Sequence, residues 1–265
     1  MGRWPKKPTL PAGWAIQRST IHALMVRDLM LRYGRDNIGF GWVILEPMIL
    51  TAGVMAIWSA MGLHKEGVKA IELALTGYMP LTLWRHLTNS TVNMYRMGVG
   101  MLYHRRVSLL DLVLSRQLLE VISTSAALLI IYAVLMLSGL IQNISRLDLF
   151  LLGWLMMAWV GMAFGMWLAA ITERYEVAER FVQPIQYLNL PLSGAFFFVD
   201  WLPSWAQNII MLHPLVHCYE VFRAGYFGET MVSHYNLTYF TAVTFLLTFI
   251  GLRSVKNVRE HVRLN

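Results

Sequence analysis

The residues whose types and spacing come nearest to enzyme chemistry are His213, His217 and Glu220. In a helix these three would share one face, as the ligands of a Zn²⁺ ion do. Pro214 argues against a metal, because it places His213 at the helix cap, and the sequence supplies neither an acid after the first histidine nor an evident fourth ligand. We therefore expect no metal site and keep a membrane-embedded metal enzyme only as an alternative. We expect Glu220 and Arg223, three residues apart, to neutralise each other near the membrane face.

Motifs that bind nucleotides or perform hydrolysis are missing from the sequence. The phosphate-binding pattern G-x-x-x-x-G-K-[ST], the nucleophile pattern G-x-S-x-G and the zinc-protease pattern H-E-x-x-H do not occur. The chain thus lacks the loop by which such proteins hold the phosphates of ATP. We expect that the chain is not itself an enzyme and that it holds no cofactor of its own.

The composition indicates a membrane protein. Hydrophobic residues make up 57% of the chain and charged residues 14%, whereas soluble domains have about 45–50% and about 25%. The apolar residues are grouped in blocks, as a bilayer requires. Because most of the lysines and arginines flank these blocks, the net charge of +7 is better explained by membrane topology than by nucleic-acid binding. The single cysteine, Cys218, excludes an intramolecular disulfide.

Six apolar blocks are bounded by charged or turn-forming residues, and we expect each to cross the membrane. A helix needs about twenty residues to cross ~30 Å of hydrocarbon, so the third and fourth blocks are ample and the last two barely suffice. With both termini in the cytoplasm, most of the 22 lysines and arginines fall on the cytoplasmic side, as the positive-inside rule requires. The blocks are Phe40–Ala60, Leu73–Met94, Leu118–Leu140, Leu147–Ile171, Phe181–Phe198 and Leu237–Leu252.

Three cytoplasmic segments lie outside these blocks. Gly13–Arg35 mixes charges with an apolar flank, which favours a helix at the cytoplasmic interface, although an ordinary lead-in helix is the alternative. Leu102–Gln117 is expected to be a basic loop containing a short helix. Thr172–Arg180 is expected to be a tighter loop of one or two helical turns, and plain solvated connectors are the alternative for both loops.

The external segment Asp200–Tyr235 is too apolar for a free loop and too broken for a span. Prolines are favoured in the first turn of a helix, so we expect two short helices, Ser204–Leu212 and Leu215–Tyr226. The two could form a hairpin that re-enters the outer leaflet, which is possible only where protein or water satisfies the backbone.

Charges inside the predicted spans are costly, and such residues usually face a cavity or a partner. Glu46 precedes Pro47 in the first block, near its cytoplasmic end, where it could also cap a helix or pair with an arginine. Arg85 and His86 lie within the second block. For Arg85 the alternative is snorkelling toward the outer interface.

Three stretches carry a family resemblance: residues 32–47 (RYGRDNIGFGWVILEP), 191–203 (PLSGAFFFVDWLP) and 214–227 (PLVHCYEVFRAGYF). Together they resemble the ABC type-2 permeases that export capsular polysaccharide, of the KpsM-like kind, over nearly the whole chain. The family typically has Asn-Pro before Leu-Val-His, where this chain has His213-Pro214. That departure lies at a helix cap.

The resemblance implies an all-α membrane protein of the bacterial inner membrane. Residues 1–39 would be a cytoplasmic N-terminus with an interfacial helix, residues 40–252 a six-span ABC type-2 transmembrane domain with a re-entrant external hairpin, and residues 253–265 a cytoplasmic tail. It also implies a homodimer with two separate ATP-binding subunits, which would bind ATP and Mg²⁺. A periplasmic polysaccharide copolymerase and an outer-membrane channel would complete the route of a lipid-linked polysaccharide.

Roles for individual residues follow from this hypothesis. Guanidinium groups pair with phosphate, and aromatic faces stack on sugar rings. We expect the anionic lipid or linker end to be met by Arg27, Arg32 and Arg35, and the sugar path to be lined by Trp42, Trp58, Trp201 and Tyr219. Gate or structural charges would be Glu46, Arg85, Glu220 and Arg223, and coupling to the ATPase would involve Tyr103, Arg105, Arg106, Asp111, Arg174, Glu176 and Glu179. The same architecture could instead export O-antigen, teichoic acid or a small drug.

Overall fold

The computed structural model describes residues 10–33, 68–95 and 107–262, together with positions 45, 49, 53 and 57. The first predicted span, Phe40–Ala60, therefore lies largely outside the described residues. So do Arg35, Trp42, Glu46, Trp58, Tyr103, Arg105 and Arg106, and of Arg32 only the backbone is described.

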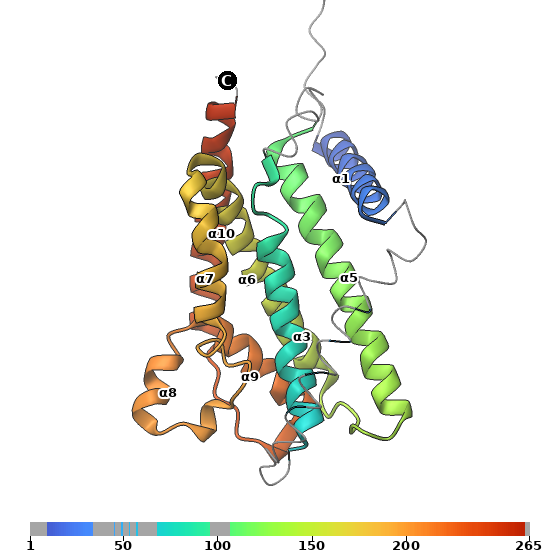
Figure 1. Ribbon diagram of the computed structural model, residues 1–265, viewed down its shortest axis with the longest axis vertical. Helices are drawn as coiled ribbons and strands as arrows, with labels where there is room; N and C mark the ends of the chain where they lie inside the picture. Colours follow the sequence, from blue (N-terminus) through green and yellow to red (C-terminus); the bar gives the residue numbers. More distant parts are fainter. Residues whose placement is uncertain are drawn as a thin grey trace, which may run out of the picture.

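All the regular elements of the described part are helical (Figure 1). The long helices are α1 (Leu10–Tyr33), α3 (Ala70–Asn89), α5 (Leu109–Leu137), α6 (Leu147–Arg174) and α10 (Leu237–Val262). The shorter helices are α7 (Glu176–Asn189), α8 (Ser204–Ile210) and α9 (Pro214–Phe227), with 3-10 turns at Val199–Trp201 and Gly228–Thr230.

Three of the described helices are long and apolar enough to cross a membrane. They are α5 with 29 residues, α6 with 28, and the 22-residue stretch Leu237–Val258 of α10. These helices match the third, fourth and sixth predicted blocks. The fifth block is not one continuous helix, because α7 has only 14 residues and the chain then turns through residues 190–198. A helix of that length rises about 21 Å, which is less than the hydrocarbon thickness.

The helices run alternately up and down in one bundle (Figure 1). Helix α6 is central and contacts α3, α5, α7, α9 and α10. Helix α1 packs on the first turns of α5, at the end of the bundle where α10 finishes, and we call this the α1 end. Helices α8 and α9 lie at the opposite end, which we call the hairpin end.

Two of the predicted loops are wrong in their boundaries. The helix expected inside Leu102–Gln117 is the beginning of α5 itself, which starts at Leu109 behind a capping box formed by Ser108 and Asp111. The segment Thr172–Arg180 contains only one non-helical residue, Tyr175, so α6 and α7 meet at a sharp corner. The two short helices expected within Asp200–Tyr235 are confirmed as α8 and α9.

Helices α6 and α9 cross at glycines. A Cβ atom on Gly225 would lie 2.1 Å from the backbone nitrogen of Phe150, and one on Gly153 would lie 2.4 Å from that of Phe222. The rings of Phe150 and Phe222 stack beside this crossing with centroids 4.2 Å apart. Small residues allow such close approach, which is how helices associate where lipid removes the hydrophobic driving force.

We expect Gly225→Ala to lower the melting temperature of the purified protein in detergent. The new Cβ would collide with the backbone of α6, and overpacking of this kind costs about 1–3 kcal/mol. Gly13→Ala is the matched control, because a Cβ at Gly13 of α1 would meet nothing within 4 Å. That control should keep or raise the melting temperature, since alanine favours a helix over glycine by about 1 kcal/mol. Equal melting temperatures for the two variants would contradict the close crossing.

Candidate functional site

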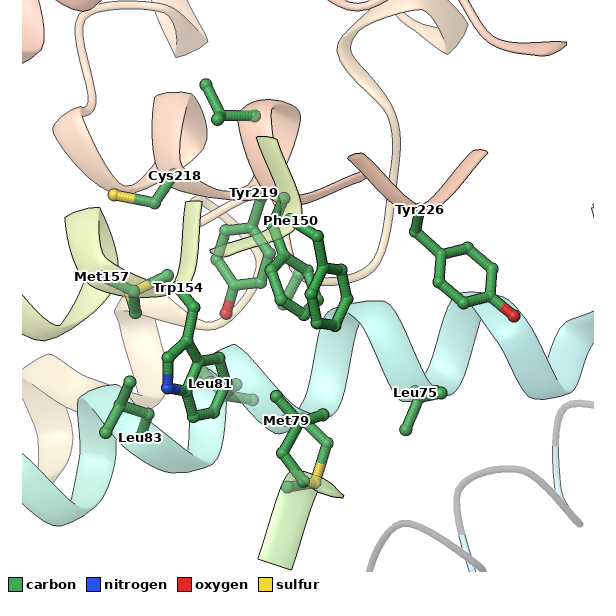
Figure 2. Packing of buried hydrophobic residues seen from close by; sticks show 14 of the residues in the cluster. Leu75, Met79, Leu81, Leu83, Phe150, Trp154, Met157, Cys218, Tyr219 and Tyr226 are labelled. Carbon is green, nitrogen blue, oxygen red and sulfur yellow. The ribbon is translucent and has the colours of Figure 1, made fainter. Parts of the chain in front are cut away.

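Helix α9 is buried on every side, although it is only 14 residues long. Figure 2 shows its Tyr219 and Tyr226 among the core residues, with Phe150 and Trp154 of α6 and side chains of α3 close by. Its last carbonyls are not left unpaired, because the backbone N–H groups of Ser145 and Arg146 donate to Tyr226 and Gly225. The element is thus a core helix rather than a peripheral hairpin arm.

Polar side chains of α9 hold the irregular segments around it. The Nε2 of His217 donates to the carbonyl of Met211 at 2.9 Å, and its Nδ1 accepts from the backbone N–H of Asn236 at 3.1 Å. The Oε1 of Glu220 accepts from Val199 N at 3.2 Å, and its Oε2 accepts from His234 N at 2.9 Å. Both side chains therefore bind backbone on two sides of the helix.

Arg223 completes this set one turn further along α9. Its Nη1 donates to the carbonyls of Gly194, at 2.8 Å, and Phe197, and its Nη2 donates to that of Ala195 at 2.6 Å. The guanidinium also lies 4.4 Å from the ring centroid of Phe198. A planar fork with several donors suits three carbonyls of one turn. We call His217, Glu220 and Arg223, at positions i, i+3 and i+6, the α9 clamp.

The clamp residues make their hydrogen bonds to backbone groups. No ion pair within 4 Å joins Glu220 and Arg223 in the described part of the chain, although their opposite charges still attract each other at longer range. The histidines and Glu220 do not converge on one point, and the described residues contain no group of three side chains able to hold a metal. Burial lowers the pKa of His213, which keeps its Nδ1 free to accept from Leu215 N at 3.3 Å.

A second polar feature joins α3 to α7. The Nε2 of Gln186 donates to Thr88 Oγ1 at 2.8 Å and to Asn89 Oδ1 at 2.9 Å, and Gln183 Nε2 donates to the same Asn89 oxygen at 3.1 Å. One turn away, the guanidinium of Arg85 lies 5.9 Å from the ring centroid of Tyr187. We call Arg85, Thr88, Asn89, Gln183, Gln186 and Tyr187 the polar seam. It offers amide, hydroxyl, guanidinium and aromatic groups in an otherwise apolar bundle.

Arg85 lies in the second half of its helix. It is in the last turns of α3, toward the α1 end, and stacks with Tyr187. Its neighbour His86 points to α5, where its Nδ1 lies 3.5 Å from the buried Oε2 of Glu120. Such a pair fits the rule that charges in spans face the bundle interior.

The α1 end is tied together by charged side chains. Asp28 of α1 pairs with its neighbour Arg27 and lies 3.4 Å from Arg116 of α5. Asp111 is buried. It caps the start of α5 together with Ser108 and accepts a hydrogen bond from Gln17 at 3.1 Å. Asp111 thus positions α1 against α5.

The corner between α6 and α7 is the exposed part of this end. Arg174, Tyr175 and Glu176 are exposed, Glu179 is half-buried, and the guanidinium of Arg174 lies 5.5 Å from the ring centroid of Tyr175. Arg174, Glu176 and Glu179, three of the residues predicted for coupling, therefore lie within six consecutive positions around this corner. Asp111 is separate from them in its cap.

The aromatic residues predicted for the sugar path are placed differently. Tyr219 is buried within the core, with its ring centroid 5.6 Å from the guanidinium of Arg223. Trp201 is half-buried and packs against Phe198, with ring centroids 4.7 Å apart and the ring planes tilted by 54°. A role for either residue in the sugar path stays a prediction. The side chain of Tyr219 is not exposed on the surface of the described subunit.

Sequence reasoning missed Glu120 and the two glutamines of the seam. A signal was present for each, because Glu120 interrupts the apolar block that begins at Leu118, and Gln183 and Gln186 stand three residues apart in the next-to-last block. Their partners could not be read from spacing, since they lie on another helix.

We expect Arg223→Lys to loosen the turn at residues 194–197. A lysine keeps the charge but lacks the planar guanidinium. The carbonyls of residues 194–197 would therefore lose hydrogen bonds that each stabilise the fold by about 1.5–3 kcal/mol. Chymotrypsin should then cut faster among Phe196, Phe197 and Phe198, and the melting temperature should fall. Arg146→Lys is the control, because Arg146 is exposed and pairs with the exposed Asp148 at 2.8 Å; its effect should stay within about 0.5 kcal/mol. Unchanged proteolysis of Arg223→Lys would contradict the clamp.

Comparison with known proteins adds to this geometry. Residues 19–227 match the model of a family described as ABC-2 type transporter. The chain is 36% identical over 255 residues to the capsule polysaccharide export inner-membrane protein BexB of Haemophilus influenzae, covering 96% of each chain. It is 34% identical over 249 residues to CtrC of Neisseria meningitidis serogroup B, which has the same description, with 94% of each covered. It is 22% identical over 259 residues to the polysialic acid transport protein KpsM of Escherichia coli, covering 96% of this chain and 98% of that one. The chain belongs to the ABC-2 type transporter family.

Proposed function

We propose that the chain is the permease subunit of an ABC exporter that moves lipid-linked capsular polysaccharide across the bacterial inner membrane. The observation that carries the proposal is the polar seam between α3 and α7, in a chain whose relatives of equal length are capsule polysaccharide export proteins. A polymer rich in hydroxyl groups needs hydrogen-bonding partners on its way through hydrocarbon. The seam has such groups, and the ring of Tyr187 adds an apolar face on which sugars stack.

The free energy for transport would come from ATP hydrolysis by a separate subunit. The chain lacks the glycine-rich pattern that holds ATP phosphates, so ATP and Mg²⁺ would be bound by two ATP-binding partners beneath a homodimer. The exposed α6–α7 corner at the α1 end would be one docking surface, together with Tyr103, Arg105 and Arg106. Arg27, Arg32 and Arg35 would then meet the anionic lipid end of the polymer as it enters.

The finer topology belongs to the same proposal. Six spans with both termini in the cytoplasm would place the α1 end inside the cell and the hairpin end in the periplasm. The buried helix α9 would be the re-entrant part of the hairpin, since its clamp satisfies irregular backbone at membrane depth. A periplasmic copolymerase and an outer-membrane channel would receive the polymer there.

We expect Tyr187→Ala to reduce surface polysaccharide about tenfold in a strain that depends on this chain, because the seam would lose its stacking surface. Tyr187→Phe keeps the ring and should restore most of the export. Leu188→Ala is the neighbouring control, since Leu188 is exposed on α7 outside the seam. The measurement is the amount of extracted surface polymer at equal membrane levels of each variant. Full export by Tyr187→Ala would remove the seam from the path, and accumulation of O-antigen or teichoic acid instead would identify another cargo.

We expect the charge reversal Glu176→Arg, combined with Arg174→Glu, to abolish co-purification of the ATP-binding protein and its stimulated ATP hydrolysis. Both residues lie on the exposed corner, where a partner's charges would be complementary. Asp148→Arg is the control, because Asp148 is equally exposed but belongs to the first turn of α6, at the hairpin end. If the corner variant retains the ATP-binding protein as well as the Asp148→Arg control does, the corner is not the docking surface. If the wild-type chain itself recruits no ATP-binding protein, the exporter proposal is wrong.

A further inference from the structure

A groove of about 240 Å³ runs between the second half of α6 and α7. It is lined almost entirely by apolar side chains, with Gln186 as the one polar residue. The lining residues are Phe164, Trp167, Leu168, Ile171, Ala178, Phe181, Val182, Ile185 and Gln186. No part of the polar seam other than Gln186 reaches it.

The groove lies beside the attachment of α7 to its neighbours. Gln183 and Gln186 fasten α7 to α3 by hydrogen bonds, and α7 also contacts α6, to which it is joined through the single residue Tyr175. Phe181 and Ile185 line the groove and are nevertheless 58% and 55% exposed. The groove is therefore open to the medium around the bundle. Because α6 is long and apolar enough to span a membrane, we expect that medium to be hydrocarbon.

Helical spacing places a cation just beyond one end of the groove. The groove residues of α6 recur every three or four positions (Phe164, Trp167, Leu168, Ile171), and the next position in this series is Arg174, the last residue of the helix. Arg174 is exposed and stacks on Tyr175 at 5.5 Å. Arginine and tyrosine at the end of a span are typical of the membrane interface, where a guanidinium binds phosphate through two parallel hydrogen bonds.

We propose that this groove binds one acyl chain of an anionic membrane phospholipid, with the phosphate on Arg174. The apolar lining suits the acyl chain, and the exposed guanidinium of Arg174 suits the charge of the headgroup. The ligand is a lipid of the surrounding leaflet and not the lipid anchor of the cargo, so the inference does not rest on the proposed export function. The bound lipid fills the space between α6 and α7 and fixes α7 on the side that its hydrogen bonds leave free.

The first test uses the unaltered chain together with its ATP-binding partner, reconstituted in vesicles of phosphatidylglycerol and phosphatidylcholine without polysaccharide. A phosphatidylglycerol carrying a photoreactive group on one acyl chain is activated, and the labelled peptides are identified by mass spectrometry. The label should appear on residues 164–185. Labelling confined to α5 or α10 would overturn the proposal, as would a groove labelled only after the polysaccharide is added.

The second test separates chain from headgroup by native mass spectrometry of the same complex. Ala178→Phe fills the groove and should reduce retained phosphatidylglycerol about fivefold, because the acyl chain loses its buried surface. Ala133→Phe, the same change at an exposed position of α5, should retain as much as the unaltered chain.

Arg174→Gln should remove the preference for phosphatidylglycerol over phosphatidylcholine while some lipid remains bound. Arg180→Gln is its control: Arg180 is exposed, and it stands two positions from both Ala178 and Val182, hence on the other side of α7. The proposal would be overturned if Ala178→Phe and Ala133→Phe retained equal amounts of phosphatidylglycerol. It would also be overturned if Arg174→Gln kept the preference for phosphatidylglycerol over phosphatidylcholine. The photolabelling result still decides if either variant fails to assemble.

Discussion

The structure depends on how irregular backbone is satisfied inside a helical membrane bundle. A helix pairs its own amides and carbonyls, but the turn at residues 194–197 and the irregular segment at 232–236 cannot, and an unpaired group in hydrocarbon costs several kcal/mol. The side chains of His217, Glu220 and Arg223 supply the missing partners from one buried helix. Glu72 at the start of α3 does the same for Gln142 N, at 3.0 Å. Buried polar and charged side chains are used here to hold loops.

This clamp determines where the rest of the chain can go. Because residues 194–197 are bound to Arg223, α7 must end before them, and it cannot extend into a full-length span. The backbone of α9 in turn approaches α6 at Gly153 and Gly225 so closely that side chains are excluded from the crossing. The central helix, the buried helix and the turn therefore form one unit, and α3 joins it where Gly77 leaves room for the carbonyl of Ala195.

Helix α7 contacts this unit in two ways. Its glutamines donate hydrogen bonds to α3, and its apolar side chains face α6 across the groove, with Gln186 belonging to both. Its first residues form the exposed corner at the α1 end. The corner and the polar seam are therefore parts of one short helix.

The sequence by itself determined the class of the protein, the helical spans of α5, α6 and α10, and the two short helices α8 and α9. These follow from apolar block length and from proline positions, which act locally. It also determined the family, because the motifs that carry the resemblance are contiguous. Only the tertiary structure decided that the fifth block breaks after α7, that Tyr219 is buried, that Glu120 meets His86, and that Arg223 binds a turn and not Glu220. Each of these depends on a partner brought near by folding, and spacing along the chain carries no record of which helix will lie beside which.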